Sequence, residues 1–203
     1  MRVASGTARG IPLHAPKHAG ETLRPTMEVV KNAIFNSLAE SIVGTRVLDL
    51  FAGIGSLGIE ALSRGAESCI FVESDRHACE AIRGNLAKTR LGGGEVVCAD
   101  ALGWLDRTVS SRTFHVILAD PPYAKKPGDH DFAAMLLASA SLRRALKPGG
   151  LFILEHLPGA PLAPGDAWEC VRDKRYGSTA VAFLRPLTDA PLAGAHSAPT
   201  PAP

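Results

Sequence analysis

The feature that most constrains the fold is a regular alternation of short apolar runs with segments of helical periodicity. Such alternation is typical of an α/β protein with a mainly parallel sheet covered by helices on both faces. The expected strands are residues 46–51, 68–73, 95–99, 114–119 and 151–155, and the expected helices between them are 56–64, 75–89, 101–108 and 130–146.

The two ends of the chain follow different patterns. Residues 168–172 and 179–184 predict two final strands, and the short connection between them favours an antiparallel edge hairpin over a helical crossover. At the other end, glycine and proline residues predict a small hairpin or extended arm, and a helix begins near Pro25 or Thr26 and continues to about Ser41. We therefore divide the chain into an N-terminal arm and helix (1–41), a main domain (42–186) and a disordered Ala/Pro-rich tail (187–203).

Composition excludes several classes of protein. No apolar run approaches the roughly 20 residues that span a bilayer, and the N-terminus lacks the apolar core of a signal peptide, so we expect a cytoplasmic protein. The four cysteines form no C-x-x-C pair and have no histidine at zinc-ligand spacing, so we expect no metal site. A net charge of +2 does not by itself indicate a partner.

A glycine-rich loop joins the first expected strand to the first core helix. Gly53, Gly55 and Gly58 have the G-x-G-x-x-G spacing, in which a missing Cβ lets a ligand approach the backbone. Glu73 ends the second strand twenty residues after Gly53, where a carboxylate can accept both hydroxyls of a ribose. Because NAD and S-adenosylmethionine both contain this ribose, the spacing alone permits either cofactor.

Asp49 favours S-adenosylmethionine over a dinucleotide. It lies four residues before Gly53, where a negative charge suits a cationic sulfonium group and would repel a pyrophosphate. The loop from Phe51 to Gly55 also resembles the Asp-x-Phe-x-Gly-x-Gly loop of class I methyltransferases. We therefore expect S-adenosylmethionine as the cofactor and a class I, Rossmann-like methyltransferase fold. Its seven-stranded, mainly parallel sheet would end in the antiparallel hairpin and carry the small N-terminal hairpin and helix.

Asp100 follows the third expected strand and has two readings. Its carboxylate could accept a hydrogen bond from the adenine amino group, with the backbone N–H of Ala101 offered beside it. Alternatively, Asp100 caps the helix that begins at Ala101. The two roles are compatible.

The segment Asp120-Pro121-Pro122-Tyr123 follows a buried apolar run and emerges at the carboxyl edge of the expected sheet, where open α/β sheets bind ligands. Two consecutive prolines remove two backbone donors but leave their carbonyls and the Asp120 carboxylate as acceptors. Such a site suits the exocyclic amino group of a nucleobase, and Tyr123 offers a flat ring for stacking. A rigid turn explains the tetrapeptide alone equally well, but the glycine loop and Glu73 favour the functional reading.

These residues together resemble the RsmD family, which methylates a guanine N2 in bacterial 16S rRNA. The resemblance covers roughly residues 2–185, and the Arg-Pro-Thr segment at 24–26 is more specific than the cofactor loop. Residues 124–130 fix no base contact, and the tail beyond Pro186 has no counterpart in the family pattern. The segments that carry the resemblance are 6–10, 23–26, 35–38, 49–66, Glu73 and 120–123.

The resemblance implies transfer of a methyl group from S-adenosylmethionine to guanine N2, without a metal. The partner would be 16S rRNA within the 30S subunit or an assembly intermediate, acted on by a monomer away from any membrane. Asp120 and the Pro121 carbonyl would accept N2–H bonds and stabilise the charge that develops on nitrogen, while Tyr123 stacks on the extruded base. Arg9, Arg24 and Lys31 are the expected phosphate contacts.

Three other functions remain open from the sequence. An adenine-N6 methyltransferase could use the same tetrapeptide, although 203 residues leave no room for a separate DNA-reading module. A dinucleotide-dependent oxidoreductase would leave 120–123 unexplained. An RNA-binding protein with a degenerate cofactor site is disfavoured by the intact glycine loop and carboxylates.

Overall fold

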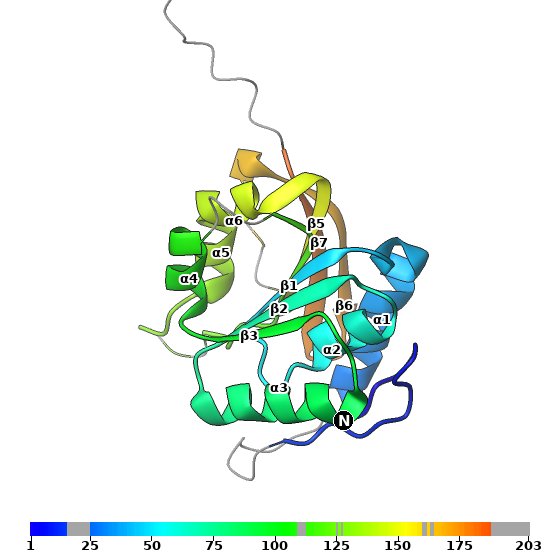
Figure 1. The fold of residues 1–203 in the computed structure, drawn as a ribbon. Coiled ribbons are helices and arrows are strands. Elements are labelled where there is room, and N and C mark those ends of the chain that lie inside the picture. Colours follow the sequence, from blue (N-terminus) through cyan, green and yellow to red (C-terminus); the bar gives the residue numbers. More distant parts are fainter. Residues whose placement is uncertain are drawn as a thin grey trace, which may run out of the picture.

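The computed structural model describes residues 1–15, 25–108, 113–124, 126, 128–159, 162 and 165–187, and these form one seven-stranded sheet with helices on both faces (Figure 1). The strands are β1 Arg46–Leu50, β2 Ser68–Glu73, β3 Gly94–Cys98, β4 Phe114–Ala119, β5 Leu146–His156, β6 Trp168–Tyr176 and β7 Thr179–Pro186. The helices are α1 Pro25–Leu38, α2 Ser56–Ser63, α3 Arg76–Thr89, α4 Ala101–Thr108, α5 Phe132–Ala138 and α6 Ala140–Ala145, with short 3-10 helices η1 Ala39–Ile42 and η2 Gly165–Ala167.

The strand order β3-β2-β1-β4-β5-β7-β6 confirms the expected fold class. The first five strands in this order are parallel, β7 is antiparallel to β5, and β6 is antiparallel to β7. The order of the chain reverses between β1 and β4, and a crevice opens at such a point outside the carboxyl ends of the strands. The glycine loop after β1 and the Asp-Pro-Pro-Tyr segment after β4 both lie at this point.

Two hydrophobic layers cover the sheet. The side chains of α1, α2 and α3 pack on one face with Val47, Phe71 and Leu118, whereas α4, α5 and α6 cover the other face with Leu48 and Ile117 (Figure 1). Alternation along each parallel strand sends successive side chains to opposite layers. Among the described residues, no helix is long and apolar enough to cross a membrane.

The described part of the N-terminal arm belongs to the first of these layers. Val3, Ala8 and Leu13 are buried in the same cluster as α1 and α2, and Arg2 and Pro12 form the antiparallel bridge of the expected small hairpin. The arm is fastened mainly through its backbone, whose groups bond to buried polar side chains of α2 and α3. These bonds include Ala4 and Ser5 N–H to Glu60 at 2.7 and 3.0 Å, and His14 N–H to Asn85 at 2.7 Å.

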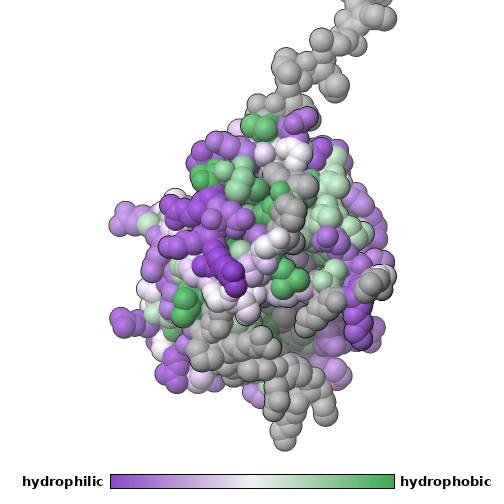
Figure 2. Space-filling view, turned by 180° about the vertical axis from the view of Figure 1, so that it is seen from behind, coloured by the Kyte–Doolittle hydropathy of each residue, from purple (hydrophilic) through white to green (hydrophobic). Residues whose placement is uncertain are grey.

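Two segments differ from the sequence expectation. The expected helix over 130–146 is two helices, because Ser139 leaves the helical conformation and its hydroxyl accepts the Leu142 N–H at 3.1 Å to cap α6. Strand β5 begins at Leu146 rather than 151, and its pairing with β4 shifts register between Phe114 and Val116. Figure 2, which views the opposite side from Figure 1, shows small groups of hydrophobic residues among hydrophilic ones in the described surface.

Candidate active site

Four carboxylates line the carboxyl edge of the central strands. Leu50 of β1 pairs with Val72 and Ala119, and Ala119 pairs with Leu154, so the edge positions of β2, β1, β4 and β5 are in register. Continuing the strand alternation places all four acidic side chains on the α1–α3 side of the sheet. They are Asp49, Glu73, Asp120 and Glu155.

The glycine loop turns sharply beneath these carboxylates. Gly53 and Gly55 have φ of +54° and +80°, a region that glycine enters without strain. A Cβ at Gly53 would meet no atom within 4 Å, whereas a Cβ at Gly58 would lie 2.3 Å from the Phe71 ring. Gly58 is therefore required for packing of α2 on β2, and Gly53 leaves open space in which a cofactor can approach the loop.

Glu73 holds the loop and the start of α3 together. One carboxylate oxygen accepts the Gly53 N–H at 2.8 Å, and the other accepts the Asp75 N–H at 2.9 Å. The oxygen that accepts the Asp75 N–H also accepts the Ser74 hydroxyl at 3.3 Å, whereas the oxygen bonded to Gly53 keeps one lone pair for a ribose hydroxyl. This geometry fits the expected ribose contact, which stays a prediction.

Asp49 lies under the loop and is almost fully buried, with 2% of its surface exposed. Burial raises the pKa of Asp49 to about 8, the Gly58 amide that it accepts at 2.9 Å opposes this, and the charges of Asp120 and Glu73 add to it. A cation beside Asp49 would favour the ionised carboxylate. The buried Asp49 carboxylate therefore fits the positive sulfonium of S-adenosylmethionine and does not fit a negatively charged pyrophosphate.

Asp120 is a partly buried acceptor that no donor among the described residues occupies. Its carboxylate receives no hydrogen bond from any residue that the structure describes, and Pro121 and Pro122 have no N–H to offer it. Burial, followed by the charge of Glu155, raises the pKa of Asp120 to about 7. The site presents a free carboxylate that can both accept a hydrogen bond and take up a proton near neutral pH.

Tyr123 is anchored by residues that the sequence reasoning missed. Its hydroxyl oxygen lies 2.6 Å from Thr179 Oγ1 and 3.3 Å from Glu155 Oε1, and the Thr179 hydroxyl donates to Glu155 at 2.9 Å. Burial raises the pKa of the Tyr123 phenol. A glutamate ending the fifth strand, as Glu73 ends the second, was the signal that could have identified Glu155. Thr179 gave no such signal.

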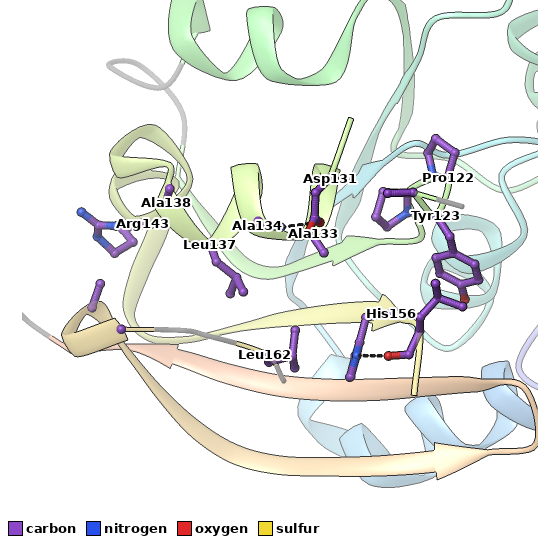
Figure 3. Close-up of a pocket in the computed structure, with 15 residues that line it drawn as sticks. Pro122, Tyr123, Asp131, Ala133, Ala134, Leu137, Ala138, Arg143, His156 and Leu162 are labelled. Carbon is purple, nitrogen blue, oxygen red and sulfur yellow. Dashed lines mark hydrogen bonds between the residues drawn. The ribbon is translucent and has the colours of Figure 1, made fainter. Parts of the chain in front are cut away.

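An apolar pocket of about 490 Å³ lies between the Asp-Pro-Pro-Tyr segment and helices α5 and α6 (Figure 3). Pro122 and Tyr123 form one end, and Leu137 of α5 lies along the wall with Arg143 toward the far end. The His156 ring also faces the pocket, with Nδ1 3.0 Å from the Leu157 carbonyl. This pocket gives Tyr123 open space beside its ring.

The other expected cofactor residues lie around the same edge. Asp100 accepts the Gly103 N–H at 2.7 Å, so its reading as a helix cap is confirmed and an adenine contact stays a prediction. Ala101 is buried at the first position of α4. The Phe51 ring packs 5.2 Å from that of Phe132, which places it between the loop and α5.

Of the expected phosphate contacts the structure describes Arg9 and Lys31, and these two differ in exposure. Arg9 is exposed on the arm, and Arg24 lies outside the described residues. Lys31 as a phosphate contact is wrong, because it is 1% exposed and its ammonium lies 3.3 Å from Glu60 and 2.6 Å from the Arg2 carbonyl. The Lys31 ammonium thus lies between two acceptors, one Glu60 carboxylate oxygen and the Arg2 carbonyl, and it stabilises the packing of the N-terminal arm on α1 and α2 instead.

The doubly wound sheet, the glycine loop after β1, the carboxylate ending β2 and Asp-Pro-Pro-Tyr after β4 define a class I S-adenosylmethionine-dependent methyltransferase. The family described as Conserved hypothetical protein 95 matches residues 1–185, and the chain belongs to this family, the RsmD family expected from the sequence.

Individual relatives agree with this assignment. The chain is 32% identical to Ribosomal RNA small subunit methyltransferase D of Haemophilus influenzae, over 87% of this chain and 89% of that protein. It is 38% identical to YlbH of Bacillus subtilis, over 91% of this chain and 98% of that protein. The structure of yhhF from Escherichia coli superposes with a TM-score of 0.74 at 29% identity, covering 92% and 97% of the two chains.

A more distant structure shares the fold. The Thermus thermophilus RsmC structure, described as a 16S rRNA N2 G1207 methyltransferase with AdoMet and guanosine, has a TM-score of 0.67 at 23% identity, covering 84% of this chain and 45% of that one. The family and the relatives named as ribosomal RNA methyltransferases show that the protein is an enzyme that methylates ribosomal RNA with S-adenosylmethionine as its cofactor.

Proposed function

We propose that the enzyme methylates the exocyclic N2 of a guanine in 16S rRNA, within the 30S subunit or an assembly intermediate, and acts as a monomer. The observation that carries the assignment to an exocyclic amino group is the Asp120 carboxylate, which accepts no hydrogen bond from the described residues, at an edge where Pro121 and Pro122 offer no backbone donor. The choice of guanine rests on the RsmD family assignment. A donor-poor edge with an unoccupied carboxylate selects a hydrogen-bond donor, and an exocyclic amino group is one. Ribosomal RNA as the substrate favours action in the bacterial cytoplasm.

Bound S-adenosylmethionine supplies a methyl group on a cationic sulfur. In the proposed reaction the N2 lone pair forms the new N–C bond as the C–S bond breaks, and the sulfur leaves as a neutral thioether. Asp120 accepts one N2–H bond and thereby orients the lone pair and stabilises the positive charge developing on nitrogen. With a pKa of about 7, the Asp120 carboxylate can also take the proton that N2 releases.

Tyr123 and the arm complete the proposed site. The Tyr123 ring is held by Thr179 and Glu155 at its hydroxyl, so it offers a preorganised face on which an extruded base can stack. Arg9 is exposed and is retained as a proposed phosphate contact, together with Arg24 from the sequence alone. The proposed cofactor contacts are Asp49, Phe51, Gly53, Gly55, Glu73, Asp100 and Ala101.

The test is transfer of labelled methyl from S-adenosylmethionine to 30S subunits of a strain that lacks this activity, followed by nucleoside analysis. We expect label in N2-methylguanosine, and loss of at least about 100-fold in rate with Asp120→Ala, the range of a general base. The exposed Asp106→Ala variant is the matched control and should retain the rate. Label in N6-methyladenine would refute the guanine assignment and leave the enzyme class intact.

A further inference from the structure

Glu155 lies beside Asp120 on the neighbouring strand. Because Ala119 pairs with Leu154 in the parallel β4–β5 ladder, the next residue on each strand faces the same side of the sheet, about 5 Å from its neighbour. The charges of the two carboxylates interact, since Glu155 raises the pKa of Asp120. Two acceptors therefore stand next to each other where the reacting base must lie.

The Glu155 carboxylate is held in one orientation. Thr179 Oγ1 donates to its Oε1 at 2.9 Å, and the Tyr123 hydroxyl approaches the same oxygen at 3.3 Å. Its Oε2 accepts no hydrogen bond from any side chain or backbone group within the described ranges. No buried side-chain oxygen or nitrogen among the described residues lacks a partner, so Oε2 is accessible from the crevice. One oxygen is fixed by the protein and the other is left for a ligand.

Guanine and adenine differ at N1, the atom with which Glu155 Oε2 can form a hydrogen bond. Guanine presents two adjacent donors, N1–H and N2–H, whereas adenine presents the N6–H donor beside an N1 lone pair. A pair of neighbouring carboxylates matches the two donors of guanine. A carboxylate facing the adenine N1 would be repelled and left unpaired, and sites built in this way reject analogues strongly.

We propose that Glu155 is a specificity-determining residue that accepts the guanine N1–H while Asp120 accepts the N2–H. This assignment rests on the proposed function and deepens it, because it names the group that excludes adenine. Thr179 is the positioning residue that aims Glu155, and Tyr123 links the same carboxylate to the stacking face. The arrangement joins β4, β5 and β7 at one point of the sheet edge.

The test compares guanine with 2-aminopurine at the target position of reconstituted 30S subunits that contain ligated 16S rRNA. 2-Aminopurine keeps the reactive amino group but has a lone pair in place of N1–H. We expect wild-type kcat/KM to favour guanine on the order of 100-fold, as for a hydrogen bond to a charged group. In Glu155→Gln the amide can donate to the N1 lone pair, so this ratio should fall below about 10-fold.

Glu169→Gln is the matched control, because Glu169 is exposed on β6, and it should keep the wild-type ratio. Unchanged cofactor affinity by calorimetry shows that Glu155→Gln has folded. A wild-type ratio near one, or an unaltered ratio in the folded Glu155→Gln variant, would overturn the role of Glu155. Absence of N2-methylguanosine with the wild-type enzyme would instead overturn the proposed function itself, so the two failures are distinguishable.

Discussion

The ionisation of Asp120 predicts the pH dependence of methyl transfer. The pKa of Asp120 is raised to about 7 by burial and by the charge of Glu155. Only the ionised carboxylate can take the released proton, and it accepts the N2–H bond more strongly than the protonated acid does. At saturating cofactor, the single-turnover rate should therefore rise with pH, from about a tenth of its plateau at pH 6 to about nine tenths at pH 8, as expected for one group titrating at that pKa.

The assay is a rapid-quench measurement of labelled 30S subunits with the enzyme–cofactor complex in excess, so that product release does not limit the rate. Saturating cofactor is required because Asp49 also has a raised pKa, of about 8, and would add its own pH dependence to cofactor binding. The Asp120→Asn variant should lose most of the rate and the dependence on pH. Its amide keeps the shape of the side chain but takes up no proton near neutral pH.

A change at Glu155 tests the cause of the raised Asp120 pKa. Since the charge of Glu155 contributes to the raised pKa of Asp120, Glu155→Gln should move the midpoint of the profile to lower pH. The Glu169→Gln control should leave it unchanged. A wild-type rate that is constant between pH 6 and 8, or a midpoint that Glu155→Gln leaves in place, would refute this account of the carboxylate pair.

Two further predictions concern the stability of the fold. The pKa of Asp49 is raised in the folded state to about 8 from 3.8, so its contribution to stability is present below about pH 4 and is lost as pH rises toward 8. Asp49→Asn should therefore raise the free energy of unfolding at pH 8 by at least about 1 kcal/mol, measured by urea titration without cofactor. The same variant should bind the cofactor more weakly. Equal stability of the variant and the wild type at pH 8 would contradict this account. Glu60→Ala should destabilise by about 3–5 kcal/mol, because it leaves the buried Lys31 ammonium without its carboxylate. The exposed Glu80→Ala should cost less than about 0.5 kcal/mol, and a similar loss in both variants would show that the Glu60 ion pair has no special weight.

Local patterns predicted most of the architecture. The strand and helix alternation, the hairpin of β6 and β7, and the glycine loop all follow from short-range periodicity and backbone freedom, which neighbouring residues carry. The break at Ser139 was missed because a serine can continue a helix or cap a new one, and only the surrounding packing selects between these. The early start of β5 was missed because Pro148 and two glycines read as a turn.

The sequence by itself indicated an S-adenosylmethionine site and an acceptor for an amino group, because the glycine spacing, Glu73 and Asp-Pro-Pro-Tyr are each signals that lie at the end of a single expected strand. Only the tertiary structure decided which charged groups face one another. Lys31 reads as a surface cation until Glu60 and the Arg2 carbonyl, each 29 residues away, surround it. Glu155 becomes the neighbour of Asp120 only through the register of β4 and β5, which long-range pairing sets and no local pattern encodes.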